Sequence, residues 1–346
     1  MYKMQFNQFA FKGCQFPSPE IEKFRFIDLF AGIGGFRLAM QSVGGKCLFS
    51  SEWDKDAQTT YFENFGELPA GDIRDISEKD IPNHDVLCAG FPCQPFSLAG
   101  VSARNSRNTA HGFACETQGT LFFDVMRIVA EKRPAVIFLE NVKNIVRHNE
   151  GNTFAVIKRT IEDLGYSFNY TLVNAQTEVP QKRIRCYIVC LRDTKQKFEF
   201  PIFSGTPLPL KSILENENTL GDEFTISDKL WAGHQRRTAT NLARGVGFTA
   251  FCVDINKPAN TLVARYGKDG KECLIPQLGK NPRKLTPREC ARLQGYPESF
   301  KIPVSKTAAY KQFGNSVALP VIKKISEKIS DYLMEERQCN SELFKK

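Results

Sequence analysis

Strand-sized apolar runs alternate with amphipathic helical patterns between Phe24 and about Leu191. The apolar runs that predict strands cover residues 24–30, 46–51, 85–89, 135–139, 167–173 and 186–191. Helical periodicity lies between them, at residues 35–43, 54–65, 120–132 and 152–164. This alternation predicts an α/β fold with a doubly wound, mostly parallel sheet that carries helices on both faces.

The pattern changes beyond Arg192, where short polar pieces containing Gly and Pro follow one another to about Arg283. Such a region predicts a second, smaller domain of irregular or β structure. Helices return at residues 286–294, where Thr286 begins a capping box with Glu289, and at residues 319–333, which we expect to pack on the first domain. The predicted organisation is an N-terminal extension at 1–22, a first domain at 23–192 plus 304–346, a second domain at 193–283 and a hinge region at 284–303.

The composition indicates a globular protein, and the distribution of charge indicates which class of molecule it binds. The 346 residues are 42% hydrophobic and 25% charged, and no apolar run has the length of a membrane span or the pattern of a secretion signal, so a cytoplasmic location is expected. The 11 cysteines include no C-x-x-C pair, which predicts reduced thiols and no metal site. The net charge is +9, and residues 181–300 hold 20 Lys and Arg against 12 Asp and Glu. This excess favours a polyanion as partner, the alternative being a basic solvated surface.

One cysteine stands where a nucleophile is expected. Cys93 follows the predicted strand at 85–89, in the proline-bounded loop Gly-Phe-Pro-Cys-Gln-Pro-Phe-Ser at residues 90–97. Turns outside the carboxyl ends of strands are where α/β proteins place their chemistry, and a thiolate is a strong nucleophile. The alternative is a small buried hydrophobe, which is what most free cysteines are.

The first strand leads through Asp-Leu-Phe-Ala-Gly-Ile-Gly-Gly at residues 28–35 into a helix, so the backbone can approach a ligand closely. The full G-x-G-x-x-G fingerprint is missing, which disfavours a pyrophosphate. About twenty residues on, Glu52 can accept hydrogen bonds from ribose hydroxyls, and Trp53 can stack on an adenine whose amino group Asp72 can receive. An adenosine site without phosphate recognition indicates S-adenosylmethionine and methyl transfer. The alternative for each acid is a helix cap or a solvated turn.

Together these motifs closely resemble the bacterial C5-cytosine DNA methyltransferases of restriction-modification systems. The matching segments follow the family's order and spacing and cover most of the chain except residues 1–22 and about 195–280; they are 26–36, 52–54, 71–73, 90–97, 120–123, 140–142, 181–185, 283–297 and 312–317. The resemblance implies an S-adenosylmethionine-dependent methyltransferase fold, in which the first domain is catalytic and binds the cofactor and the second is a target-recognition domain. It also implies an enzyme, a DNA (cytosine-5-)-methyltransferase, that protects host DNA.

By resemblance, Cys93 attacks C6 of a cytosine flipped out of duplex DNA, so that C5 takes the methyl group from S-adenosylmethionine. Glu140, at the end of a buried strand, carries or shares the proton at cytosine N3. Arg185 contacts cytosine O2, and Arg183 supports the carboxylate and the loop. Without the resemblance, Glu140 would be a surface strand end, and the two arginines a basic strand edge that blocks aggregation.

The resemblance also assigns two larger sets of residues. Those expected to surround the cofactor are Phe30, Gly32, Ile33, Gly34, Gly35, Glu52, Trp53, Asp72, Ile73, Pro92, Leu121, Asn315, Ser316 and Val317. Those expected to contact DNA, from a loop at 96–119 that closes over the base and from the second domain, are Ser97, Arg104, Arg107, Arg236, Arg237, Arg244, Thr261, Arg265 and Lys268. Residues 245–248 and 265–270, with the loop at 101–118, look most like the branch that modifies palindromes beginning with CC.

Three other functions fit parts of the pattern. A zinc-dependent cytosine deaminase needs H-x-E and P-C-x-x-C, and the chain has neither. A tRNA methyltransferase with the same catalytic parts carries a Cys-Phe-Thr element, which the residues Phe251-Cys252-Val253 do not match. A DNA-binding repressor on a methyltransferase scaffold is disfavoured because Cys93 and Glu140 are both present. We therefore expect a nucleoid-associated monomer that binds double-stranded DNA and no membrane, and a cognate restriction endonuclease that acts on the same site without physical association.

Overall fold

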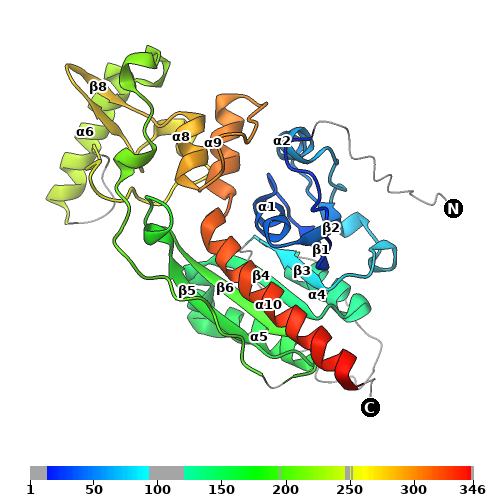
Figure 1. The fold of residues 1–346 in the computed structure, drawn as a ribbon. Helices are drawn as coiled ribbons and strands as arrows, with labels where there is room; N and C mark the ends of the chain where they lie inside the picture. Colours follow the sequence, from blue (N-terminus) through cyan, green and yellow to red (C-terminus); the bar gives the residue numbers. More distant parts are fainter. Residues whose placement is uncertain (1–13, 93–120, 195, 246–249, 251, 344–346) are drawn as a thin grey trace.

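A six-stranded sheet forms the centre of the larger part of the molecule (Figure 1). The computed structural model describes residues 14–92, 121–194, 196–245, 250 and 252–343, with the backbone alone at 339–343. The strands are β1 (Phe24–Leu29), β2 (Gly45–Ser51), β3 (Val86–Ala89), β4 (Val136–Val142), β5 (Asn169–Asn174) and β6 (Ile184–Leu191). Their order is β2-β1-β3-β4-β6-β5; β6 runs antiparallel to both of its neighbours, whereas the other pairs are parallel.

Helices cover both faces of this sheet, which confirms the predicted fold class. Helices α1 (Gly35–Ser42) and α10 (Leu319–Leu343) pack on one face, and α4 (Leu121–Lys132) and α5 (Asn152–Asp163) pack on the other. Helix α2 (Lys55–Phe65) follows β2. Every strand and helix predicted between Phe24 and Leu191 is present, with ends that differ by a few residues.

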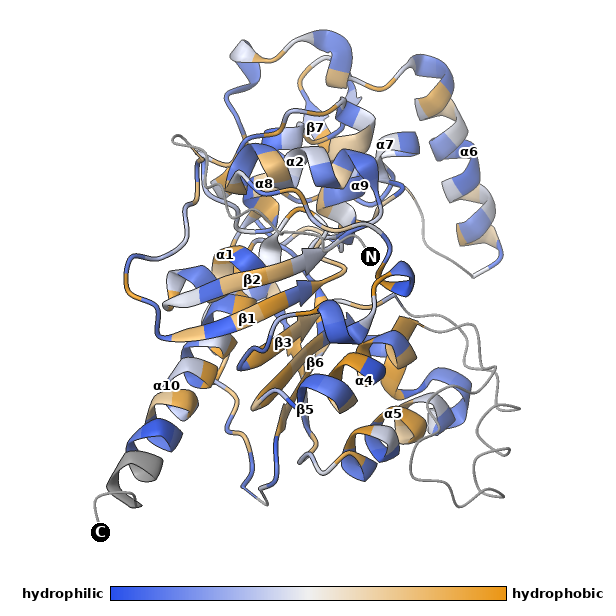
Figure 2. Cartoon of the chain, turned by 90° about the vertical axis from the view of Figure 1, so that its right-hand side faces the viewer, coloured by the Kyte–Doolittle hydropathy of each residue, from blue (hydrophilic) through white to orange (hydrophobic). Residues whose placement is uncertain are grey.

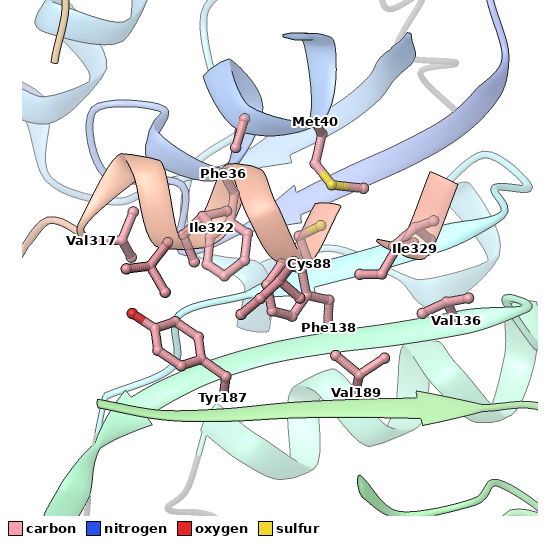
Figure 3. Close-up of a cluster of buried hydrophobic side chains, with 14 of the residues drawn as sticks. Phe36, Met40, Cys88, Val136, Phe138, Tyr187, Val189, Val317, Ile322 and Ile329 are labelled. Carbon is pink, nitrogen blue, oxygen red and sulfur yellow. The ribbon is translucent and has the colours of Figure 1, made fainter. Parts of the chain in front are cut away.

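The core under α1 and α10 joins distant parts of the sequence (Figure 3). Phe36 of α1 meets Phe138 of β4 edge to face, with ring centroids 5.1 Å apart. Ile322 and Ile329 of α10 are fully buried in the same cluster. Figure 2 shows that hydrophobic residues dominate the strands of the sheet, as expected for strands covered on both faces. The same core therefore contains side chains from β1 and from α10.

The smaller part of the molecule contains α6 (Asp228–Ala243), α7 (Tyr266–Asp269), β7 (Ile275–Gln277) and β8 (Lys280–Arg283) (Figure 1). Helices α8 (Pro287–Leu293) and α9 (Lys306–Asn315) follow it in the chain. Strands β7 and β8 pair antiparallel. The sequence pattern did not indicate the 16-residue helix α6. His234 is its one buried residue, so α6 lacks the broad apolar face by which amphipathic helices are recognised.

Local signals set the start of α8. The hydroxyl of Thr286 accepts a hydrogen bond from the Glu289 amide at 3.0 Å, and the Glu289 carboxylate accepts one from the Thr286 amide at 2.8 Å, which confirms the predicted capping box. The remaining connections include 3-10 turns at Ile73–Asp75, Glu78–Asp80, Lys143–Val146, His148–Gly151, Ala175–Thr177, Leu210–Ile213, Glu217–Thr219 and Asp222–Phe224. Across the part of the chain that the structure describes, no helix has both the length and the apolar character needed to span a membrane.

Candidate active site

The turn between β1 and α1 adopts a left-handed backbone conformation beside a cavity. The φ angle is +57° at Phe30, +55° at Gly32 and +85° at Gly34. A Cβ atom on Gly34 would lie 2.2 Å from Cε2 of Phe65, so both the dihedral angle and the available space require glycine there. The turn thereby brings the backbone of Gly32 and Gly35 to the cavity wall.

Glu52 connects this turn to the end of β2. Its Oε2 accepts a hydrogen bond from the Gly32 amide at 2.8 Å, and its Oε1 accepts one from the Asp54 amide at 2.8 Å. Burial raises the pKa of the Glu52 carboxyl, and the backbone amides oppose this shift. The neighbouring Trp53 is 71% exposed and lines the same cavity. A carboxylate that orders the turn and keeps further lone pairs is suited to bind a diol.

The segment at the end of α9 forms another part of the cavity wall. The hydroxyls of Ser316 and Tyr296 are hydrogen-bonded at 2.7 Å, and the Ser316 carbonyl accepts a hydrogen bond from the Arg183 guanidinium. A Cβ atom on Gly35 would lie 2.6 Å from Cγ2 of Val317 and 2.8 Å from the Tyr296 hydroxyl. The start of α1 and the segment before α10 therefore meet in close contact.

The chain that follows β3 lies beside Glu140 of β4. A Cβ atom on Gly90 would lie 3.9 Å from Oε2 of Glu140. The buried Asn141 donates a hydrogen bond from Nδ2 to the Phe91 carbonyl at 2.9 Å, which fixes the backbone just before Pro92. Cys93 lies outside the described residues, and so do the predicted DNA contacts Ser97, Arg104 and Arg107.

Glu140 and Arg185 form an ion pair at this edge of the sheet. Nε of Arg185 lies 3.2 Å from Oε1 of Glu140, and the two side chains are 14% and 12% exposed. Burial raises the pKa of Glu140, while the charges of Arg185 and Arg183 oppose the shift. Arg183 is directed elsewhere, because its Nη1 donates to the Leu262 carbonyl at 3.2 Å; burial lowers the pKa of Arg183 to about 10. Arg185 thus makes the direct contact with the carboxylate, and Arg183 acts on it through charge.

A cavity of about 400 Å³ joins these groups. The predicted site residues that line it are Phe30, Gly32, Ile33, Gly35, Glu52, Trp53, Pro92, Leu121, Glu140, Arg183, Arg185, Asn315, Ser316 and Val317. Residues from both ends of the described chain therefore meet around one space.

Three predicted cofactor residues, Gly34, Asp72 and Ile73, are not among the lining residues. The Asp72 carboxylate caps a 3-10 turn and accepts a hydrogen bond from Nε of Arg74 at 3.0 Å. This pairing with Arg74 lowers the pKa of Asp72. In this structure the alternative reading of Asp72, a helix cap, is therefore the one observed.

The predicted site residues did not include four polar residues that line the cavity, Asp54, Asn141, Lys311 and Gln312. Lys311 forms an ion pair with Asp54 beside Trp53. Gln312 accepts a hydrogen bond from the Thr60 hydroxyl at 3.0 Å. Helix α9, which carries Lys311 and Gln312, was not predicted, although Gln312 begins the matching segment 312–317.

Comparison with known proteins identifies the family of the chain. Residues 24–331 match the family described as C-5 cytosine-specific DNA methylase. The chain belongs to this family. It is therefore an enzyme, a DNA (cytosine-5)-methyltransferase, and the glycine turn, Glu140 and the Arg183–Arg185 strand all lie within the matched residues.

The relatives of this methylase include bacterial type II methyltransferases. It is 50% identical over 323 residues to the type II methyltransferase M.SsoII of Shigella sonnei, covering 91% of this chain and 82% of the relative. It is 43% identical to M.HhaI of Haemophilus parahaemolyticus, covering 89% and 95%. Among solved structures, the Dnmt2 methyltransferase of S. pombe matches with a TM-score of 0.68 at 18% identity, covering 90% of this chain and 98% of the other, which shows the same fold.

The predicted DNA contacts of this methylase that the structure describes lie mostly on its surface. The exposed ones are Arg236, Arg237, Arg244, Arg265 and Lys268. Thr261 differs, because it is half-buried and its hydroxyl donates to the Lys182 carbonyl at 2.6 Å. No group of His, Cys, Asp and Glu within the described ranges is arranged to hold a metal ion.

Proposed function

We propose that this methylase flips one cytosine of its target out of duplex DNA and methylates C5 through a covalent adduct with Cys93. The observation that carries the proposal is the convergence of Glu140, Arg185 and Pro92 in the cavity that Gly32 and Glu52 also line. A centre suited to a pyrimidine and a site suited to an adenosine thus share one space.

In the proposed reaction, the Cys93 thiolate adds to C6 while Glu140 places its proton on N3. Because burial raises the pKa of Glu140, the protonated carboxyl is more accessible near neutral pH than that of an exposed glutamate. Arg185, which contacts Glu140, is placed to bind O2 of the base. After C5 has gained the methyl group, loss of the C5 proton breaks the C6–S bond, which restores the thiolate and returns the N3 proton to Glu140. The balance is one methyl group transferred and one proton released.

S-adenosylmethionine supplies the methyl group in this proposal, and the donors and acceptors of the cavity fit it. The Glu52 carboxylate offers acceptors to the ribose hydroxyls, and the exposed Trp53 indole offers a face to the adenine. Residues 315–317 line the same cavity and contact the end of the glycine turn at Gly35. A contact between Asp72 and the adenine amino group requires the Asp72–Arg74 pair to rearrange.

We further propose that residues 193–283 read the target, that residues 23–192 with 304–346 carry the chemistry, and that residues 284–303 form the hinge between them. The basic excess of residues 181–300 and the exposed arginines of α6 support binding to phosphates. The names of the relatives support a role beside a restriction endonuclease. The enzyme acts as a monomer on a palindrome that begins with CC.

The test is transfer of labelled methyl from S-adenosylmethionine to unmethylated genomic DNA and to tRNA, with Cys93→Ala beside the wild type. Base-resolution sequencing then locates the modified cytosines. Methylation of one short palindrome, absent with Cys93→Ala, supports the proposal and identifies the target. Label in tRNA alone refutes the DNA target, and undiminished methylation by Cys93→Ala refutes the covalent mechanism.

A further inference from the structure

Leu262 is held through both of its backbone polar groups by buried side chains. Its amide donates a hydrogen bond to Oε1 of Gln181 at 2.7 Å, and its carbonyl accepts one from Nη1 of Arg183 at 3.2 Å. The adjacent Thr261 donates from its hydroxyl to the Lys182 carbonyl at 2.6 Å. Gln181 and Leu262 are fully buried. The Thr261–Leu262 element is therefore fixed in register with the segment that enters β6.

Gln181 also reaches toward the cofactor side of the molecule. Its Nε2 donates to the Leu293 carbonyl at 3.2 Å and lies 3.4 Å from Oε1 of Gln294. The side-chain Nε2 of Gln294 donates in turn to the Phe313 carbonyl at 2.7 Å. Phe313 lies two residues before Asn315, which lines the cavity. A buried chain of hydrogen bonds thus runs from Leu262 to the segment that we assign to the cofactor.

Arg183 makes a second link between the same two places. One of its terminal nitrogens donates to the Leu262 carbonyl and the other to the Ser316 carbonyl. Arg183 itself is 2% exposed. The first link begins at the Leu262 amide and ends at the Phe313 carbonyl. The second begins at the Leu262 carbonyl and ends at the Ser316 carbonyl.

The chemistry of position 181 calls for a glutamine. The Leu262 amide requires an acceptor and the Leu293 carbonyl requires a donor, so the two contacts fix the orientation of one primary amide. A glutamate there would bury a charge, and an apolar side chain would leave the Leu262 amide without a partner in the interior. The two hydrogen bonds, and not packing alone, therefore require a glutamine at position 181.

We infer that Gln181 and Gln294 are positioning residues that couple DNA binding at Thr261–Leu262 to cofactor binding at residues 315–317. The inference rests on the proposed function, in which residues 193–283 bind the target DNA, with Thr261 among the predicted contacts, and residues 315–317 bind the cofactor. Because the network is rigid, a ligand that holds one end in its bound position also favours the bound position of the other end, and the second ligand then binds more tightly. The coupling is reciprocal, because both affinities refer to one thermodynamic cycle.

The experiment measures the dissociation constant of S-adenosylhomocysteine by titration calorimetry, with and without duplex DNA that contains the target. The full chain is compared with Gln181→Met and Gln294→Met. Gln277→Met is the matched control, because Gln277 bonds Thr225 and Asn281 within the smaller part and does not touch the network. We expect DNA to tighten binding by about 5–150-fold in the wild type and in the control. The ratio should be clearly smaller in both network variants, where the Arg183 link alone still joins the two elements. The double variant should lose no more coupling than either single one, because both act on one route.

An unchanged ratio in folded Gln294→Met overturns the inference. This variant keeps the Gln181–Leu262 bond, so it decides the question if Gln181→Met does not fold. A wild type whose cofactor affinity ignores DNA also overturns the inference. Neither result bears on methyl transfer to DNA, which is scored separately and decides the proposed function.

Discussion

The Glu289 carboxylate holds together the start of α8, and its replacement by glutamine is expected to lower the free energy of unfolding by about 3–5 kcal/mol. Its Oε1 accepts hydrogen bonds from Arg283 at 2.8 Å and from the Glu215 amide at 2.9 Å; its Oε2 accepts from Arg283 at 2.8 Å and from the Thr286 amide at 2.8 Å. The Arg283 and Glu289 side chains are 2% and 0% exposed. In the Glu289→Gln variant, the new NH₂ group would face two N–H donors, and Arg283 would stay buried without its counter-charge.

A matched control is Glu298→Gln. Glu298 binds Arg292 through the same two-pronged geometry, at 2.7 Å and 2.9 Å, but the side chains are 64% and 27% exposed. Solvent screens that pair, so the expected cost is below about 1 kcal/mol. Urea unfolding of both variants, followed by circular dichroism and fluorescence, measures the difference. If both substitutions cost the same, the argument that burial decides the contribution of an ion pair is wrong here.

Three further predictions follow from the site and the core. Glu140→Gln should reduce the rate of methyl transfer by about 10²–10⁴-fold, as expected for loss of a proton donor, while calorimetry shows cofactor affinity within a few-fold of wild type; a rate within tenfold of wild type would contradict the assigned role. Glu52→Gln should weaken S-adenosylhomocysteine binding by about 10–100-fold, since a hydrogen bond to a charged group contributes about 1.5–3 kcal/mol, and unchanged affinity would remove Glu52 from the site. Burial lowers the pKa of His84 to about 4, so below about pH 6.5 the unfolded chain takes up the proton first and stability falls as the pH falls. Between pH 6.5 and pH 5, the wild type should lose about 2 kcal/mol more than His84→Gln, and parallel pH profiles in urea unfolding would show that His84 is not the cause.

The sequence predicted the larger part of the molecule well because its strands and helices carry strong periodicity. Runs such as residues 135–139 are typical of a strand in a sheet that helices cover on both faces, and the capping box at Thr286 marks a helix start locally. Helix α6 was missed because His234 is its one buried residue, so hydrophobic periodicity carries almost no signal there.

The sequence predicted which residues surround the cavity for a related reason. Residues at the carboxyl ends of neighbouring parallel strands must meet at one edge, which brings Gly32, Glu52 and the segment before Cys93 together. The sequence could not predict which groups each charged side chain binds, because these partners are distant in the sequence and meet only in the folded protein. Arg183 and Arg185 have the same residue type and similar positions, yet Arg185 binds Glu140 and Arg183 binds the Leu262 carbonyl.

The position of α10 against α1 has a consequence for how the protein is made. The ribosome completes β1 long before it reaches Leu319, and at about 5–20 residues per second the interval is roughly 15–60 s. During that time the face of the sheet that α10 will cover, including Phe26 of β1, is open to water or to chaperones. A circular permutant in which α10 precedes β1 would close this face early in synthesis. Such a permutant should aggregate less during expression while it keeps the same fold.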